Sequence, residues 1–295
     1  MSELDGLAAR FEASRPRLRA AAYRMLGSAS EAEDAVQEAW LRVSRSADGV
    51  EDLNAWLTTV VARVCLDMLR SRKSRREEPL AADPEGGAPA GDTGPESEAL
   101  LADSVGLAML IVLDKLDPAQ RVAFVLHDMF DLPFAQIAGI TGRSPAAARQ
   151  LASRARRRVR GTPSVTRSEL ARQREVVEAF LAASRRGDFE ALLAVLDPDV
   201  ELRADAAAVS PGAPRHVTGA ATVARAAPAF RSRARFATLA LVDGSVGLAL
   251  APGGRLWMVL RLTVADGKVT HIDVVADPER LGRLDLAVLD AWNPA

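Results

Sequence analysis

The sequence predicts a multidomain protein with two all-α domains, the second carrying a helix-turn-helix, followed by an α+β domain. Helical periodicity of apolar residues runs through the first 160 residues, interrupted once by a stretch rich in Pro, Gly and acidic residues. Strand-like segments appear only near residue 200 and beyond, and a length of 295 residues suits two or three domains. The expected boundaries are 1–76, a linker at 77–98, 99–161, a short linker at 162–168, and 169–295.

The composition argues against a membrane protein and hides a segregation of charge. The net charge is −1, but Arg-rich segments at 70–76 and 149–160 are offset by acidic stretches elsewhere. No long uncharged apolar run suits a bilayer, and the N-terminus lacks the layout of a signal peptide, so we expect a cytoplasmic protein without a membrane partner. The single cysteine, Cys65, lies in an apolar pattern and is either core filler, which we favour, or a redox switch.

Two amphipathic helices are predicted at the start of the chain. The first covers Phe11–Met25 and ends at Gly27, and the second begins with a capping-box pattern at Ser30 and continues to Arg45. Helical spacing in the second separates its apolar side from a side that carries Asp34, Gln37, Glu38 and Leu41. An exposed leucine among polar residues indicates a protein partner, although single exposed apolar residues are also ordinary.

A third helix, predicted from about Asn54 after a polar loop at Ser46–Asp52, has a strongly basic end. Cations suit a helix C-terminus because of the helix dipole. Their number exceeds what capping requires, so we favour contact with a nucleic-acid backbone. The cations are Arg70, Arg72, Lys73, Arg75 and Arg76.

The segment between the two helical domains is predicted to be a linker, because residues 77–95 lack an apolar face. An apolar helix follows at Ala99–Leu116. Asp117 then caps the start of another helix, with proline in its first turn and Gln120 placed to reach back. The helix continues through Val122–Phe130.

The stretch Asp131–Arg160 is predicted to be a helix-turn-helix. A short helix at Phe134–Ile140 precedes Gly142, which admits the turn, and Ser144 followed by Pro145 marks the start of the next helix. That helix has no acidic residue, and one of its sides is apolar. Its other side carries Arg149, Gln150, Ser153, Arg154, Arg156, Arg157 and Arg160. This cation stripe favours DNA as a partner over the alternative, a solvated basic helix packed on a neighbour.

After residue 164 the pattern becomes that of an α+β domain. Helices are predicted at Glu169–Arg186 and Phe189–Leu196, and Asp266-Gly267 predicts a tight hairpin between the last two of five strands. The strands are predicted at Val200–Arg203, Phe236–Val242, Val246–Ala251, Arg255–Val264 and Lys268–Val275. Helices followed by an antiparallel sheet form a domain that can curl around a pocket.

The order of these parts resembles the extracytoplasmic-function sigma factors of bacterial RNA polymerase, in particular the group with a fused SnoaL-like, NTF2-like domain. The helical matches are YRMLGSASEAEDAVQEAWLRV at 23–43, AWLTTVVARVCLDMLRSRKSRREEPL at 55–80, and LDPAQRVAFVLHDMFDLPFAQIAGITGRSPAAARQLASRARRRVRG at 116–161. The tail contributes LLAVLDPDVELRAD at 192–205 and DPERLGRLD at 277–285. A helix-turn-helix alone is moderate evidence, whereas these blocks in this order around a linker are specific.

The resemblance implies an alternative sigma factor that steers RNA polymerase core to promoter DNA. Its polymerase partners would be the β′ clamp helices, which match the face with Asp34, Gln37, Glu38 and Leu41, and the β flap. The loop Ser46–Asn54 and the exposed side of 55–76, which includes Arg63, inherit recognition of the melted minus-ten element. Such a protein performs no chemistry, so no catalytic residue, cofactor or metal is expected.

The helix-turn-helix resembles the reader of the minus-thirty-five element, which enters the major groove with the first turns of its second helix. Arg149, Gln150, Ser153 and Arg154 would then contact base edges or adjacent phosphates. Arg156, Arg157 and Arg160 would contact the DNA backbone.

The tail resembles a SnoaL-like cone around a cavity, and in this sigma group it implies regulation in cis through contact with the sigma domains. Pocket candidates are Asp205, Trp257, His271 and Asp273. His271 and Asp273 alternate with Ile272 and share a sheet face, as a general acid–base pair requires. A solvent-facing polar pair is the interpretation we favour. Two departures from the group are Ala206-Ala207, where glycines are common, and a linker without a Trp-Leu-Pro motif.

Three functions are set against one another: a promoter-specificity factor tuned by its tail, a one-component regulator whose tail senses a ligand, and an enzyme tethered to DNA. Binding to polymerase core separates the first from the second. The third function, an enzyme tethered to DNA, would require that substitution of His271 abolish a measurable turnover.

Overall fold

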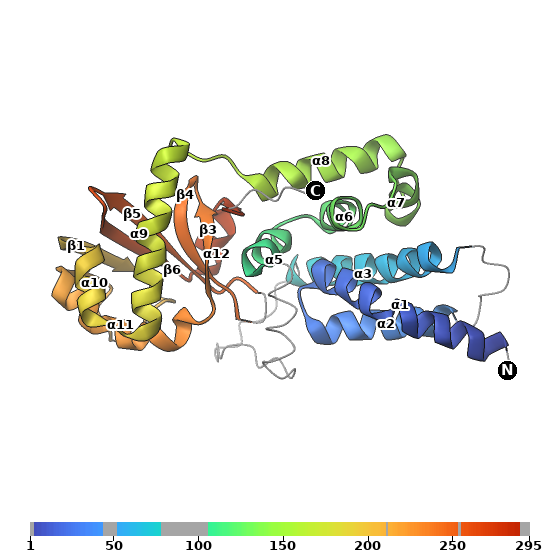
Figure 1. The fold of residues 1–295 in the computed structure, drawn as a ribbon, viewed down its shortest axis with the longest axis horizontal. Coiled ribbons are helices and arrows are strands. Elements are labelled where there is room, and N and C mark those ends of the chain that lie inside the picture. Colours follow the sequence, from blue (N-terminus) through green and yellow to red (C-terminus); the bar gives the residue numbers. More distant parts are fainter. Residues whose placement is uncertain (1–2, 44–51, 78–105, 211, 253–254, 290–295) are drawn as a thin grey trace. The chain divides into compact units, whose positions relative to one another are not determined.

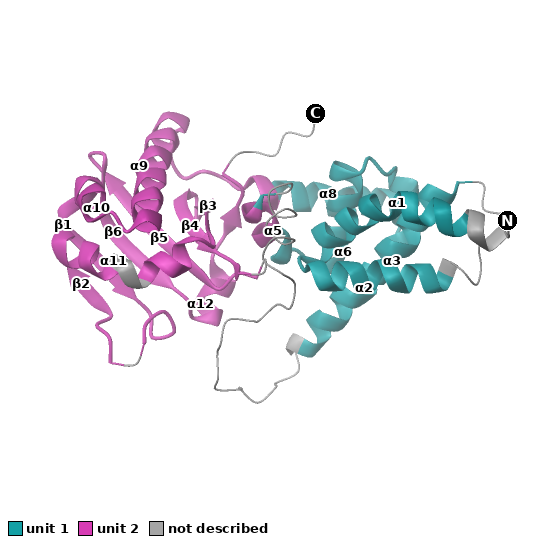
Figure 2. Ribbon diagram, turned by 60° about the horizontal axis from the view of Figure 1, so that its bottom comes forward, with its two compact units in different colours: residues 1–106, 113–157, 293–295 teal, residues 107–112, 158–292 magenta. Residues whose placement is uncertain are grey.

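The computed structural model describes residues 3–43, 52–77, 106–210, 212–252 and 255–289. These residues fall into two compact units (Figure 2). The helical unit contains the N-terminal helices and residues 113–157. The sheet unit contains residues 107–112 and the described residues from 158 onward. All of the predicted loop Ser46–Asp52 except Asp52, and most of the predicted linker, at 78–98, lie outside the described residues.

Three helices build the N-terminal part of the helical unit (Figure 1): α1 (Glu3–Leu26), α2 (Ala29–Val43) and α3 (Leu53–Glu77). α1 starts earlier than predicted and ends at Gly27, whose φ is +76°. The predicted cap of α2 at Ser30 is wrong, because the helix begins two residues sooner and the Ser28 hydroxyl accepts the N–H of Glu31 at 3.4 Å. Cys65 is fully buried in the core, and burial raises the pKa of its thiol to about 12. The thiol therefore stays protonated and packs as an apolar side chain.

The second half of the helical unit is a chain of short helices. They are α5 (Leu107–Asp114), α6 (Pro118–Phe124), the π-helix η1 (Val125–Met129), α7 (Phe134–Thr141) and α8 (Pro145–Arg160). The first residues of α5, 107–112, group with the sheet unit. Asp117 precedes α6 as predicted, but its side chain makes no capping hydrogen bond. Its carboxylate instead pairs with the Lys73 ammonium at 2.9 Å, which explains why the predicted cap is absent.

A buried cation, Arg121, joins α6 to the end of α1. Its Nε donates to the carbonyl oxygen of Arg24 at 3.4 Å, and its Nη1 pairs with the carboxylate of Asp114 at 3.3 Å. Burial lowers the pKa of the guanidinium to about 10, so it remains charged at neutral pH. A Cβ at Gly27 would lie only 3.2 Å from Nη2, so the glycine that ends α1 also leaves room for this side chain.

The sheet unit carries three helices on one face of a seven-stranded sheet (Figure 1). The helices are α9 (Arg167–Arg186), α10 (Phe189–Val195) and α11 (Ala220–Ala234). The Thr166 and Asp188 side chains cap α9 and α10, and Gly187 ends α9 in the left-handed conformation. α9 and α10 agree with the sequence prediction, whereas α11 and the short α12 (Pro278–Arg283) were not predicted.

The strands are β1 (Leu196–Ala204), β2 (His216–Thr218), β3 (Ala237–Val242), β4 (Ser245–Leu250), β5 (Met258–Ala265), β6 (Lys268–Val275) and β7 (Leu286–Ala287). They lie in the order β2-β1-β6-β5-β4-β3-β7. The prediction of an antiparallel sheet is wrong for one pair, because β1 runs parallel to β6. β1 is separated from the later strands by α11, a crossover long enough to permit parallel pairing. The short β2 and β7 were not predicted.

Two tight hairpins shape the sheet. Asp266 and Gly267 both have positive φ and join β5 to β6, as the Asp-Gly signal predicted. Asp243-Gly244 does the same between β3 and β4. A Cβ at Gly244 would lie 2.8 Å from the backbone nitrogen of Ser164, whose N–H and hydroxyl both donate to the Gly244 carbonyl. This second turn therefore holds the segment that leaves α8.

Candidate nucleic-acid and polymerase interfaces

The helix-turn-helix is built by α7, a glycine turn and α8. Gly142 ends α7 with φ of +68°, and its N–H bonds the carbonyl of Ala138, the small residue four positions earlier. The Ser144 hydroxyl accepts the N–H of Ala147 at 3.2 Å, and Pro145 occupies the first turn of α8. The turn glycine and the helix start therefore lie where the sequence predicted them.

α8 divides into a buried and an exposed side. Ala148, Leu151, Ala155 and Val159 are buried as predicted, and Ala152 is buried with them. The exposed side carries Arg149, Gln150, Ser153, Arg154, Arg157 and Arg160. The Arg149 guanidinium lies 5.4 Å from the centre of the Phe134 ring in α7, and Arg154 reaches the Gln150 side chain at 3.5 Å. The exposed cations are thus partly held in place before any DNA arrives.

Arg156 differs from the other arginines of α8 because it is committed to an internal ion pair. Its Nε and Nη2 lie 2.7 and 2.6 Å from one carboxylate oxygen of Asp128 in η1. The Asp128 side chain is 2% exposed, whereas that of Arg156 is 34% exposed. Sequence reasoning missed this pair, although an aspartate inside the otherwise apolar segment Val122–Phe130 was a signal that a buried cation faces it.

The proposed protein-binding side of α2 is exposed as predicted. Asp34, Gln37, Glu38 and Leu41 all lie on the surface, and Glu38 pairs with Arg42 one turn later. Leu41 is 45% exposed and is one of two large apolar side chains exposed in the described part of the chain, the other being Phe189. On the opposite side, Trp40 packs against the Phe11 ring with 4.8 Å between ring centroids.

The basic end of α3 is more occupied than its sequence suggested. Arg72 pairs with Glu31 and donates to the carbonyl of Leu26 at 3.0 Å, so it caps α1. Lys73 pairs with Asp117, and Arg63 donates to the carbonyl of Gly139 at 3.2 Å. Arg70 lies 4.0 Å from Asp67 and, like Arg75, is exposed. The side chain of Arg76 lies outside the described residues.

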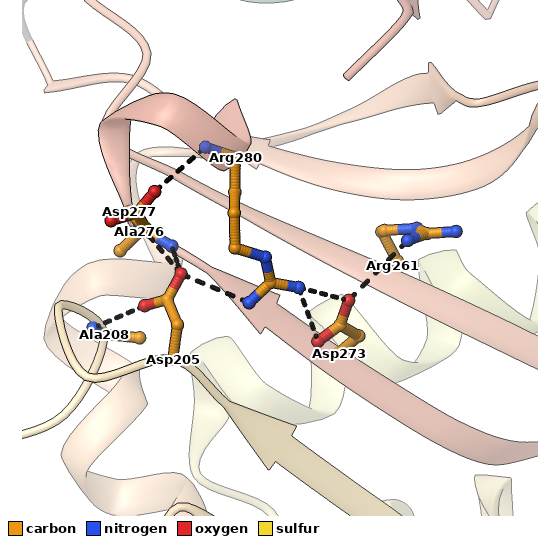
Figure 3. Close-up of polar contacts among 7 residues, drawn as sticks. All are labelled: Asp205, Ala208, Arg261, Asp273, Ala276, Asp277 and Arg280. Atoms are coloured by element: carbon orange, nitrogen blue, oxygen red, sulfur yellow. Dashed lines mark hydrogen bonds and ion pairs between the residues drawn. The ribbon is translucent and has the colours of Figure 1, made fainter. Parts of the chain in front are cut away.

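The pocket candidates of the tail do not line one pocket. His271 and Asp273 share a shallow polar depression with Glu201, Arg203 and Arg280 on the sheet face opposite the helices. Asp273 pairs there with Arg280 at 3.1 Å and with Arg261 at 3.7 Å (Figure 3). Its carboxylate is thus engaged by two guanidinium groups, as expected of the solvent-facing polar pair rather than of a free general base.

Asp205 serves as a hub for backbone donors rather than as a pocket residue. Its carboxylate accepts the N–H groups of Ala208, Ala276 and Asp277 at 2.8–3.0 Å and lies 3.5 Å from the Arg280 guanidinium (Figure 3). The prediction that it lines the pocket is wrong because these bonds point the carboxylate at the chain itself. Trp257 packs at the edge of the core and is covered by the Arg233 guanidinium, 5.2 Å from its ring centre.

The described residues offer neither a metal site nor a membrane-spanning helix. They contain no group of three or more His, Cys, Asp or Glu residues that could hold a metal ion. None of their helices combines the length and the hydropathy needed to cross a bilayer.

Two protein-family models match the helical part of the chain. The family model for sigma-70 region 2 matches residues 10–75, and the model for sigma-70 region 4 matches residues 108–159. The first match contains α2 and all but the last two residues of α3, and the second contains the helix-turn-helix up to residue 159. The helical part of the chain is therefore that of a sigma-70-type transcription initiation factor.

Two curated relatives from Mycobacterium tuberculosis extend the match to the tail. The chain is 40% identical to the ECF RNA polymerase sigma factor SigJ over 92% of its length and 91% of the relative. It is 39% identical to the probable ECF sigma factor SigI over 96% of its length and 98% of the relative. The chain belongs to the extracytoplasmic-function RNA polymerase sigma factors.

Solved structures are similar to both parts of the chain. The crystal structure of SigJ from Mycobacterium tuberculosis is 35% identical, covers 92% of this chain and 97% of its own, and has a TM-score of 0.47. An NTF2-like protein from Burkholderia xenovorans covers 37% of this chain and 85% of its own at 20% identity, with a TM-score of 0.27.

The function follows from the family. The protein is an alternative sigma factor, which brings bacterial RNA polymerase to specific promoters for transcription initiation. It interacts with RNA polymerase and DNA and is not an enzyme. Of the three functions considered on the sequence, the promoter-specificity factor is therefore confirmed, while its tuning by the tail stays a prediction.

Two adjacent arginines of α8 separate packing from DNA contact. We expect Arg156→Gln to lower the free energy of unfolding of the helical unit by about 2–3 kcal/mol, because it strands a buried carboxylate. Arg157→Gln should change it by less than about 0.5 kcal/mol. Urea unfolding followed by circular dichroism measures both changes in unfolding free energy. Equal unfolding free energies for the two variants would show that the Arg156–Asp128 ion pair does not stabilise the helical unit.

The same two variants are then titrated with DNA at several salt concentrations. Arg157→Gln should lower the slope of log affinity against log salt concentration by about one, because one phosphate contact is lost.

Proposed function

We propose that α2 presents the surface that binds the β′ clamp helices of RNA polymerase. The support is a solvent-exposed apolar side chain, Leu41, surrounded by the polar side chains of Asp34, Gln37 and Glu38 on one side of the helix. An apolar centre with a polar rim is the composition of a specific protein interface. The opposite side of α2 is used for packing, which leaves this side for a partner.

We propose further that the first turns of α8 enter the major groove of the minus-thirty-five element. Arg149, Gln150, Ser153 and Arg154 project from these turns, and Arg149 is steadied by the Phe134 ring. They would contact base edges, while Arg157 and Arg160 contact phosphates. The helix-turn-helix domain would also bind the β flap. Minus-ten recognition is assigned to the exposed side of α3, through Arg70 and Arg75, and to residues 46–54, of which 46–51 lie outside the described residues.

The tail, in this proposal, modulates the sigma factor in cis through the end of the helix that reads DNA. The carbonyl of Val159, in the last turn of α8, accepts the N–H of Val288 at 2.9 Å. Gly161 follows with φ of +58°, and a Cβ there would overlap Ala287 of β7. Residues 107–112, which precede the helix-turn-helix domain, belong to the sheet unit as well. β7 and the residue that follows it thus contact the last turn of α8 and the glycine after it, and in this proposal these contacts let the tail influence promoter recognition.

A pair of exposed apolar residues tests the polymerase surface. We expect Leu41→Ala to weaken binding of the full chain to purified core polymerase by about tenfold, because it removes the apolar centre of the interface. Phe189→Ala, which removes the other exposed large apolar side chain, should bind normally. Biolayer interferometry with immobilised core measures both affinities. Equal affinities for the two variants would move the polymerase contact to another face.

Two arginines at opposite ends of α8 test the mode of DNA reading. We expect Arg149→Ala to cost about 1–3 kcal/mol of binding to the preferred duplex and to relax its preference at one base pair. Arg160→Ala should weaken binding about equally on all sequences. The preferred duplex is obtained by selection from a randomised library with the holoenzyme, and every base pair is then permuted. A uniform loss for Arg149→Ala would reassign this side chain to a phosphate.

Two glycines with similar backbone conformations test regulation by the tail. Gly161→Ala should change the yield of transcript from a cognate promoter at least about twofold, because the new methyl group pushes β7 off the end of α8. Gly267 also has positive φ, but no atom lies within 4 Å of the position of its Cβ. Gly267→Ala carries the same backbone strain without the contact and should leave the yield unchanged. Equal transcript yields from the two variants in run-off transcription would show that the contact between Gly161 and Ala287 plays no part in regulation.

A further inference from the structure

The sheet unit contains an apolar cavity of about 300 Å³ between the helices and the inner face of the sheet. α9, α10 and α11 contribute Phe180, Leu192 and Val223, and the sheet contributes Met258, Leu260 and Ile272. The cavity lies on the opposite sheet face from His271 and Asp273, because Ile272 between them points inward. It is the interior around which the sequence predicted that the domain could curl, but none of the four residues predicted to line a pocket is among its lining residues.

One polar group in the cavity wall lacks a partner. The Ser184 hydroxyl on α9 is buried, with 1% of the residue exposed, and no group in the described residues hydrogen bonds to it. Leaving a buried hydroxyl without a partner destabilises the folded chain, because the group gives up its hydrogen bonds to water and gains none in return. An alanine would fill the same space without that cost. The serine is thus unfavourable for folding alone and suits recognition of a polar atom inside the cavity.

The charges around the cavity indicate a neutral ligand. Arg233 is the one charged residue among the lining residues of the described chain, and its guanidinium is already used. It donates to the carbonyl of Ala208 at 3.3 Å and stacks over Trp257. No carboxylate lines the cavity to receive a cation. An ionised ligand would lose its hydration there without a free counter-charge in return.

Asp205 fixes the loop that closes this cavity on one side. Ala208, Val209 and Ser210 line the cavity, and they follow directly after Asp205. Asp205 accepts the N–H of Ala208 and joins the loop to the end of β6 through Ala276 and Asp277. The wall is therefore built by a hydrogen-bonded loop rather than by loosely packed chain.

We propose that the sheet unit binds a neutral, mainly apolar small molecule with one polar group, which hydrogen bonds to the Ser184 hydroxyl. An apolar protein cavity of about 150 Å³ holds a benzene molecule. The present cavity therefore suits a ligand of roughly two fused rings or a short branched chain. This proposal concerns binding and stands whether or not the tail regulates the sigma factor.

Two aromatic probes of nearly equal shape test the proposal on the full chain. The neutral dye N-phenyl-1-naphthylamine reports binding by fluorescence, and 1-naphthol and 1-methylnaphthalene are titrated as competitors. We expect saturable one-to-one binding of the dye and displacement by both. Ser184→Ala should weaken 1-naphthol by about three- to tenfold and leave 1-methylnaphthalene unchanged, because only the former can bond the hydroxyl. Ser232→Ala, at an exposed position of α11, should alter neither affinity.

Filling the cavity provides the second arm. Ala224→Phe places a ring in the wall of the cavity and should reduce the affinity for all three molecules by more than tenfold. Circular dichroism and thermal unfolding establish that the variant is folded. Should it unfold, Val217→Phe, at the half-buried edge strand β2, fills the same space with less strain. Unchanged dye binding in a folded filled variant, non-saturable binding to the natural chain, or an equal or absent effect of Ser184→Ala on the two competitors would overturn the proposal.

Discussion

The ion pair between Asp128 and Arg156 sets which face of α8 can meet DNA. Asp128 is almost fully buried, and one of its carboxylate oxygens has no hydrogen-bond partner in the described residues, so the other oxygen must be satisfied by Arg156. α8 buries an apolar side that includes Leu151 and Val159, and Arg156 ties the helix to the buried carboxylate of Asp128. The ion pair reinforces this orientation because leaving the carboxylate unpaired would cost several kcal/mol. Arg149, Gln150, Ser153 and Arg154 face outward as a consequence.

The same helix is fixed again at its end, by a different part of the chain. Its last turn bonds to Val288, and Gly161 admits the approach of Ala287. A helix of 16 residues is about 24 Å long and stiff, so displacement of its last turn is felt along its exposed face. The Asp128–Arg156 pair lies in the helical unit, and the contacts of the last turn of α8 lie in the sheet unit. Our proposal of regulation in cis rests on the second set of contacts.

Features set by local patterns could be predicted from the sequence. The helix-turn-helix follows from Gly142, Ser144 and Pro145, and the exposed side of α2 follows from helical spacing alone. The hairpin between β5 and β6 could likewise be predicted from the two residues Asp266 and Gly267. Contacts between distant segments could not be predicted in this way. Whether Arg72 meets Glu31 or DNA, and whether Asp117 caps α6 or pairs with Lys73, depends on which helices become neighbours. The parallel pairing of β1 with β6 depends on α11, whose alanine-rich sequence gave a weak apolar period.

Asp205 has a structural role, although a carboxylate can also act in catalysis. A carboxylate can act as a general base, and Asp205 was predicted from the sequence to line a pocket. In this chain its oxygens accept three backbone N–H groups and lie beside Arg280, so a proton taken from a substrate would first have to displace them. The carboxylate instead joins the loop after β1 to the end of β6, and that loop forms one wall of the apolar cavity. The polar outer face and the apolar inner face of the sheet thus have separate tasks. Ion pairs on the outside hold the chain in shape, while on the inside the buried Ser184 hydroxyl, which has no hydrogen-bond partner in the described residues, is the group to which we assign recognition.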